Sequence, residues 1–161
     1  MTEVSNIMAH WVDTPDQIAV PTGTYQAKVV GATPKISKNN AQNVGLNPQF
    51  EITEGECKGA RVFDGLCFLA YDPSADSWQR KRSVAKVKVL FKAVGFVPDF
   101  SQFAGQAVTP EHTVKVGEDY IKPNILEKTC TIIVSNRAGD NNINDYQAPQ
   151  QAAVAPTVAA Q

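Results

Sequence analysis

Residues 46–63 read LNPQFEITEGECKGARVF and contain two strand patterns joined by a tight turn. Apolar and polar residues alternate from residue 46 to residue 53, which is typical of a half-buried strand. Two glycines in EGECKG then predict a short connection to a third strand over residues 60–69. Pro48 predicts that the second strand begins at an edge or a bulge. Gly65 predicts a bulge or sharp bend in the third strand, as a closing barrel requires.

Further strand patterns lie on both sides of this hairpin. Residues 24–30 alternate between apolar and polar side chains and predict a first strand, followed by a polar loop over residues 34–43. Residues 128–134 are rich in β-branched side chains, and residues 142–146 follow them after a turn that contains Gly139. These two segments predict the fourth and fifth strands.

One helix is predicted after the third strand. Ser74 is its expected N-terminal cap, and apolar residues then recur at helical spacing up to Gly95, the expected stop. Residues 106–127 show no clear period, and Pro123 breaks any long element there. We leave that segment unassigned.

Three strands, a helix and two strands are the element order of an OB-fold, a five-stranded barrel with its helix after the third strand. The sequence therefore predicts a mainly β, OB-like domain over residues 21–147, preceded by an arm over residues 1–20. Residues 148–161 contain no charged side chain and consist almost entirely of Ala, Pro, Gln and Val. This composition predicts a disordered tail.

Charge is unevenly distributed although the whole chain carries a net charge of −1. Residues 21–92 hold eleven Lys and Arg against six Asp and Glu, a net of +5, whereas the segments on either side each have a net of −3. A polyanionic partner is therefore compatible with the total. No apolar run approaches the ~20 residues that cross a bilayer, and residues 1–20 lack a secretory signal pattern. We expect a cytoplasmic protein without a membrane partner.

The sequence lacks the patterns of an enzyme or a metal site. Cys57, Cys67 and Cys130 are odd in number and widely spaced, which predicts reduced thiols rather than disulfides, and His10 and His112 are isolated. Neither a phosphate-binding P-loop nor a G-x-S-x-G motif is present. We therefore predict no catalytic activity, no metal and no cofactor.

Four segments resemble a known family. They are PTGTYQAKVV at 21–30, NPQFEITEGECKGARVF at 47–63, a basic helix ending in KAVGF at 92–96, and NNINDY at 141–146. The sequence is similar to phage-encoded proteins that were long catalogued as a domain of unknown function and are regarded as single-stranded DNA-binding. The resemblance implies an OB-type barrel that acts in the host cytoplasm beside phage replication or recombination enzymes. A recombinase, a nuclease and a polymerase are the implied candidate partners.

Binding single strands without sequence preference needs cations along the phosphates and exposed rings for the bases. The candidate cations are in the first loop, in the hairpin turn and on the helix: Lys35, Lys38, Lys58, Arg61, Arg80 and Arg82. The candidate rings are Phe68, Tyr71 and Trp78, whereas Phe63 is assigned to the core. Two alternatives stay open, a packing role for Trp78 and a merely solvated face for the basic run at 80–82.

We therefore expect a protein that binds single-stranded DNA and protects it during phage replication or recombination. The alternative function is a protein-interaction barrel, a scaffold or an inhibitor, whose basic face meets an acidic protein and no nucleic acid. A homodimer is compatible with either function.

Overall fold

The computed structural model describes residues 19–38, 41–65, 67–71, 74, 77–103, 105 and 109–150. The predicted arm over residues 1–20 and the predicted disordered tail over residues 148–161 therefore fall mostly outside the described residues. Only residues 19–20 and 148–150 of those two segments can be compared with the structure.

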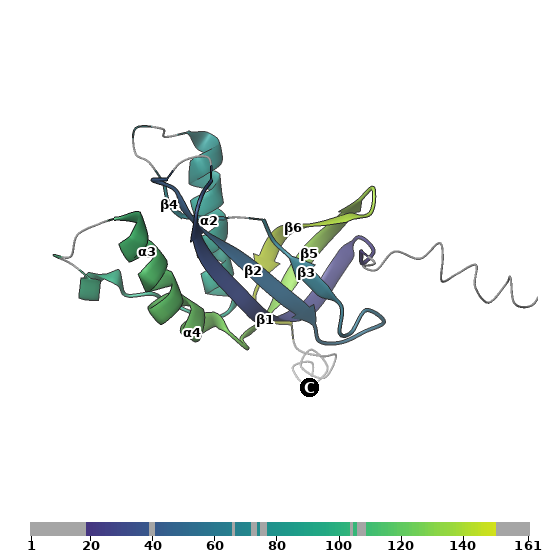
Figure 1. The fold of residues 1–161 in the computed structure, drawn as a ribbon. Helices are drawn as coiled ribbons and strands as arrows, with labels where there is room; N and C mark the ends of the chain where they lie inside the picture. Colours follow the sequence, from purple (N-terminus) through teal and green to yellow (C-terminus); the bar gives the residue numbers. More distant parts are fainter. Residues whose placement is uncertain are drawn as a thin grey trace, which may run out of the picture.

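The prediction of a mainly β protein is confirmed. An antiparallel sheet has the order β3-β2-β1-β5-β6, and β4 also pairs with β2 (Figure 1). Its strands are β1 (Gly23–Ile36), β2 (Val44–Ile52), β3 (Arg61–Phe63), β4 (Cys67–Ala70), β5 (Thr129–Arg137) and β6 (Asp140–Gln147). The largest fully buried side chains come from the sheet and from two helices, and include Phe50, Leu46, Ile52, Leu90, Ile125 and Ile132.

The prediction of a single helix is wrong. Besides α2 (Trp78–Ala93) and the short turn η2 (Phe100–Phe103), a continuous helical segment consists of α3 (Pro110–Val116), η3 (Gly117–Ile121) and α4 (Lys122–Ile125). The segment begins at a regular cap, because the Thr109 side chain accepts a hydrogen bond from the His112 amide and Pro110 occupies the first turn. It passes Pro123 through a π-helical turn, η3, which accommodates the altered hydrogen bonding.

The cap of α2 also differs from the prediction. Ser77, not Ser74, accepts the hydrogen bond from the Arg80 amide, so the helix begins three residues later. Its end agrees with the prediction, since Gly95 follows the last turn at a φ of 77°, in the left-handed region that favours glycine. α2 buries Val87 and Leu90 and packs against β4 and β6.

β1 is longer than predicted, because a bulge hides its second half. The pairing of β1 with β2 shifts register between Val29 and Gly31, so the period-2 alternation breaks there and resumes with Ala32 and Pro34 buried. The predicted loop over residues 34–43 is therefore wrong in its first part. Lys35 lies in β1, while Lys38 lies in the connection between β1 and β2.

The predicted third strand is broken at the predicted place. β3 pairs with the second half of β2 and β4 with the first half, and Gly65 lies between them. Pro48 faces this break, since its carbonyl accepts a hydrogen bond from the Asp64 amide. The backbone N and O of a strand residue point to the same side, so the nitrogen of Pro48 also faces the break. The missing N–H of Pro48 is thus placed where no ladder needs it. Of the two predicted alternatives, β2 is not an edge strand, but its pairing with β4 shifts register near its start, between Val44 and Gly45.

The sheet is not closed into a barrel by hydrogen bonds. β3 and β6 are its two edges, and no ladder joins them within the described strands. Side chains cross the gap instead: the Tyr146 hydroxyl on β6 donates a hydrogen bond to the Asp64 carboxylate, just after β3, and Lys86 of α2 lies 2.9 Å from the same carboxylate. The five-stranded closed barrel of the prediction is therefore not confirmed. Among the described residues, no helix combines the length and apolarity needed to cross a membrane.

Candidate nucleic-acid interface

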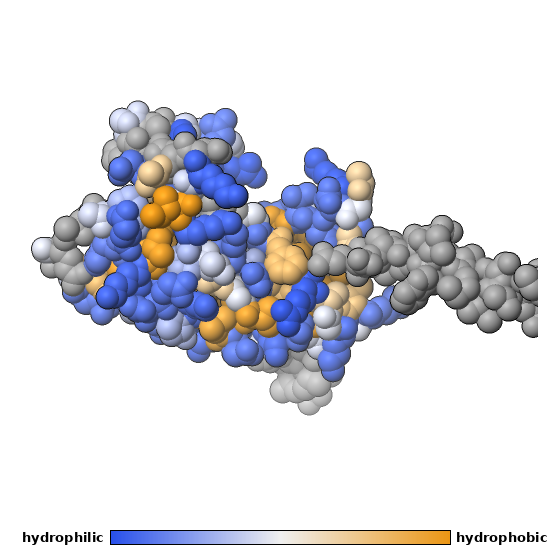
Figure 2. Space-filling view, in the orientation of Figure 1, coloured by the Kyte–Doolittle hydropathy of each residue, from blue (hydrophilic) through white to orange (hydrophobic). Residues whose placement is uncertain are grey.

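One face of the sheet points away from the core over β1 to β4. Residues directly opposite each other in an antiparallel pair share a face, so the register assigns this face without ambiguity. We call it the outer strip; it contains Lys28, Gly31, Thr33, Lys35, Gly45, Asn47, Gln49, Glu51, Arg61, Phe63 and Phe68. Figure 2 shows that polar residues predominate on the side of the molecule where β1 and β2 lie in front.

At one end of the outer strip, Arg61 is beside an exposed ring. Phe63 is 46% exposed and pairs with Gln49, whereas Val62 is 1% exposed and faces the core. The prediction that Phe63 belongs to the core is therefore wrong. Its face is set by the register of the hairpin, in which a shift of one residue would exchange Val62 and Phe63.

The charges at this end are partly compensated. Glu51 lies between Lys28 and Arg61, with N–O distances of 3.8 Å and 4.0 Å. Lys28 also contacts Glu127 at 3.5 Å. Because these pairs are solvent-exposed, each contributes little to stability and can be exchanged for a phosphate.

The other end of the outer strip combines a cation and two rings. Lys35 pairs with Gly45, and Gly45 pairs with Phe68, so Lys35 and Phe68 are on either side of a glycine in one cross-strand row. The ring of Phe68 lies 6.4 Å from that of Tyr71. Lys38 is exposed in the adjacent loop.

The predicted site residues thus form two clusters rather than one. Gly45 and Glu51 are six positions apart on β2, which is roughly 20 Å of extended strand. One end of the outer strip holds Lys35, Lys38, Phe68 and Tyr71. The other end holds Arg61, in β3, and Lys58, which is exposed in the β2–β3 turn.

Of the three candidates on α2, Trp78 and Arg82 lie together, about one turn apart, whereas Arg80 lies on another side of the helix. Trp78 is 69% exposed, and the Arg82 guanidinium lies 5.5 Å from the centre of its ring. Arg82 lines a polar groove with Arg137, between α2 and the β5–β6 hairpin, and this groove contains no residue of the outer strip. Arg80 is half-buried. A packing role for Trp78 is excluded by its exposure.

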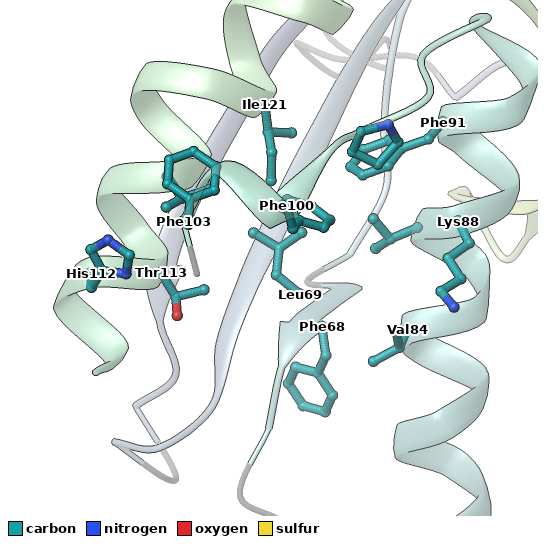
Figure 3. A pocket seen from close by; sticks show the side chains of 13 residues that line it. Phe68, Leu69, Val84, Lys88, Phe91, Phe100, Phe103, His112, Thr113 and Ile121 are labelled. Atoms are coloured by element: carbon teal, nitrogen blue, oxygen red, sulfur yellow. The ribbon is translucent and has the colours of Figure 1, made fainter. Parts of the chain in front are cut away.

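Sequence reasoning missed an apolar pocket between α2 and α3 (Figure 3). Its volume is about 390 Å³, and its walls are Phe68, Leu69, Val84, Val87, Lys88, Phe91, Pro98, Phe100, Phe103, His112, Thr113, Val116 and Ile121. More than half of these residues lie after Gly95, in segments for which the sequence predicted neither a helix nor a strand. The signal that could have found the pocket is the closely spaced pair Phe100 and Phe103, too apolar for a solvated loop.

The buried polar network around Asp64 connects β6 and α2 and stabilises the fold. Lys86 donates to Asp64 and to the Ile143 carbonyl at 2.6 Å, and the Cys67 thiol lies 3.6 Å from the carboxylate. Burial raises the pKa of the Tyr146 hydroxyl, and it raises the pKa of the Cys67 thiol to about 12. The neighbouring Asp64 carboxylate is the second cause of both shifts. Both groups therefore remain protonated. Among the described residues, no cluster of three His, Cys, Asp or Glu side chains is arranged to hold a metal ion.

The first residues after β6 lie on the sheet. The Thr131 hydroxyl donates to the Ala148 carbonyl at 2.9 Å, and the Gln150 amide donates to Gln26 Oε1 at 2.9 Å. These bonds tether residues 148–150, the described part of the predicted disordered tail, to β1 and β5.

Comparison with known proteins gives a family but no activity. No curated protein matches the chain. A family model described as "Protein of unknown function (DUF669)" matches residues 9–147, so the match begins inside the predicted arm. Because this match covers most of the chain, the protein belongs to the DUF669 family.

Proposed function

We propose that this protein binds single-stranded DNA along the outer strip, largely without sequence preference and without catalysing a reaction. One observation carries the proposal: a single sheet face has rings at both ends, cations beside them, and hydrogen-bonding side chains between them. Stacked bases and neutralised phosphates are the two contributions that such binding requires.

The topology supports an OB-like assignment, which we include in the proposal. With β3 and β4 taken as one broken strand, the chain runs through a three-stranded meander, a helical region and a final hairpin. The helical region contains α2 and the segment from α3 to α4, and β1 pairs with the first strand of the hairpin. OB-folds bind polymers on the face of their second and third strands and on the adjoining loops. The outer strip covers that face, and Lys38 is in one of those loops.

The spacing of the groups suits an extended strand. Phe63 is opposite Gln49 and Phe68 is opposite Gly45, so the two rings are roughly 13 Å apart along β2. The whole outer strip, from Gly45 to Glu51, spans roughly 20 Å, which fits the lower end of the ~4–16 nucleotides bound per OB domain. Lys35, Lys38 and Lys58 form no ion pair with any residue in the described part of the chain. They are therefore available for phosphates, whereas Arg61 must exchange Glu51 for a phosphate.

The biological setting is part of the same proposal. The resemblance noted in the sequence implies a host cytoplasm as the setting, where the protein would protect single strands during phage replication or recombination. Because it binds only the unpaired form, it would shift weak secondary structure towards the single-stranded state by mass action. A recombinase, nuclease or polymerase is the class of partner that works on such strands.

The proposal is tested by titrating the protein with oligo-dT at several salt concentrations. Trp78 is an exposed reporter, and a Trp78→Phe variant separates its signal from that of Trp11, the only other tryptophan. If Lys35, Lys38, Lys58 and Arg61 each neutralise one phosphate, the slope of log affinity against log salt is about −3. Changing Lys35, Lys38 and Arg61 to Ala together should reduce that slope by about 2.

A matched control removes the same charge elsewhere. Lys92, Lys115 and Lys122 are outside the outer strip, and their triple Ala variant should keep the wild-type salt slope. Equal losses in the two triple variants would mean that net charge, not the outer strip, determines affinity. If the wild-type protein binds no oligo-dT even at low salt, the proposed function is wrong, and the protein-interaction alternative replaces it.

A further inference from the structure

We propose that the apolar pocket between α2 and α3 receives one unstacked base of the bound strand. The inference rests on the proposed function and extends it, since the pocket is separate from the sheet face except at Phe68. It assigns the pocket a ligand class, a nucleobase with its attached phosphate.

The pocket walls suit a flat aromatic ligand. Five rings line the cavity, and they belong to Phe68, Phe91, Phe100, Phe103 and His112. Figure 3 shows Leu69 between Phe100 and Phe68, and Val84 on the side of α2. Proteins that recognise splayed-out bases hold them by stacking on rings of this kind. A volume of about 390 Å³ lies in the range of small-ligand sites.

The rings are held in position before any ligand binds. Tyr120 lies behind two of them, with its ring centre 6.1 Å from that of Phe100 and 5.5 Å from that of Phe103, both edge to face. Phe103 meets His112 edge to face at 6.2 Å. The Tyr120 hydroxyl accepts a hydrogen bond from the amide of Asp99, the residue directly before Phe100, and so fixes the start of η2. A preorganised wall lowers the entropy lost on binding.

The polar groups of the pocket match a nucleotide better than a hydrocarbon. Lys88, His112 and Thr113 are the polar side chains among the lining residues, and none of the lining residues is acidic. α2 itself contains no carboxylate. Lys88 can therefore meet a phosphate. The Thr113 hydroxyl donates to the Thr109 carbonyl at 3.1 Å and can still accept a hydrogen bond from the polar edge of a base.

The pocket is continuous with the outer strip. Phe68 lines the pocket and also occupies the cross-strand row of Lys35 and Gly45. The helical segment on the other side is pressed against the same end of the sheet, because a Cβ on Gly117 would lie 2.7 Å from the Pro34 side chain. Gly117 begins the π-helical turn η3, a feature found frequently at functional sites. A strand leaving the outer strip at Phe68 thus meets the pocket directly.

The test compares the wild type and a Phe100→Ala variant, each titrated with oligo-dT and with an abasic strand. Phe100→Ala removes a wall ring that is 49% exposed, so the variant is expected to fold. Its affinity for oligo-dT should fall about 5- to 150-fold, the loss equivalent to one stacked base. On a strand of equal length made only of abasic sites, which offers phosphates but no base, the same change should have no effect.

Two further variants complete the design. Val97→Ala is the matched control, since Val97 is 88% exposed and near the pocket in sequence but does not line it. Lys88→Ala should weaken binding of both strands equally, because it removes a phosphate contact. A 2-aminopurine placed in oligo-dT should lose fluorescence on binding the wild-type protein, and should lose less on binding Phe100→Ala.

The outcomes separate the two proposals. If oligo-dT binds and the outer-strip variants weaken it, but Phe100→Ala binds like the wild type, the pocket inference is overturned and the proposed function stands. Equal loss for the thymidine and abasic strands would also overturn it, since the pocket would then not hold a base. If wild-type protein binds neither strand, the proposed function itself fails. An acidic peptide that binds the pocket while oligo-dT does not would assign the site to a protein partner.

Discussion

Replacing Asp64 by Ala should destabilise the fold substantially, because Asp64 connects β3, β6 and α2. Its side chain is 7% exposed, lies 2.9 Å from Lys86 Nζ, and accepts the hydrogen bond of the buried Tyr146 hydroxyl. The variant leaves that hydroxyl without its acceptor and a lysine without its carboxylate. Since β3 and β6 share no backbone ladder, the substitution also removes a main link across the sheet edges.

The magnitude follows from the exposure of each partner. An unsatisfied buried hydroxyl costs about 1–3 kcal/mol. Removing one partner of a fully buried ion pair costs about 3–5 kcal/mol, but Lys86 is 28% exposed and keeps the Ile143 carbonyl, so we assign about 1 kcal/mol to it. The expected loss in the free energy of unfolding is therefore about 2–4 kcal/mol. Asp64→Asn keeps an acceptor for Tyr146 and should lose about half as much.

Urea unfolding followed by circular dichroism measures these differences, with the m-value checking that unfolding stays two-state. The double variant Asp64→Ala with Lys86→Ala should be less destabilised than the sum of the two single variants, because the two side chains interact. If Asp64→Ala stays within about 0.5 kcal/mol of the wild type, the range typical of an unimportant surface position, then the network does not hold the sheet edges together.

Two further predictions concern pH and packing. Burial raises the pKa of the Cys67 and Cys130 thiols to about 12, so their contribution to stability is complete below the unfolded value of 9 and is lost as pH rises towards 12. Urea midpoints should thus fall steeply above pH 9, and less steeply in Cys130→Ala; a wild-type midpoint that is flat to pH 11 would contradict this. Gly117→Ala should cost about 1–3 kcal/mol by pressing a Cβ against Pro34, whereas Gly65→Ala, with nothing within 4 Å of the added atom, should cost little. Equal unfolding midpoints for these two glycine variants would show that the helix can move away from the sheet.

Much of the strand content follows from local pattern. Alternation over residues 46–53 and the β-branched run at residues 128–134 both correspond to observed strands, and the break at Gly65 and the stop at Gly95 are where the sequence predicts them. These features depend on the chemistry of neighbouring residues only. The helical segment from Pro110 to Ile125 escaped prediction because its π-helical turn and Pro123 disturb the regular period.

The candidate site was predictable as a set of residue types but not as a place. The sequence by itself determined that cations and rings accompany the second and third strands, and that the chain is mainly β. Only the tertiary structure decided that Phe63 faces outward, that Arg82 belongs to a different groove, and that Phe68 joins the outer strip to an apolar pocket. The physical reason is that the face of a side chain depends on strand register, and a pocket depends on the contact of distant segments. Both are set by pairings that no local stretch of sequence contains.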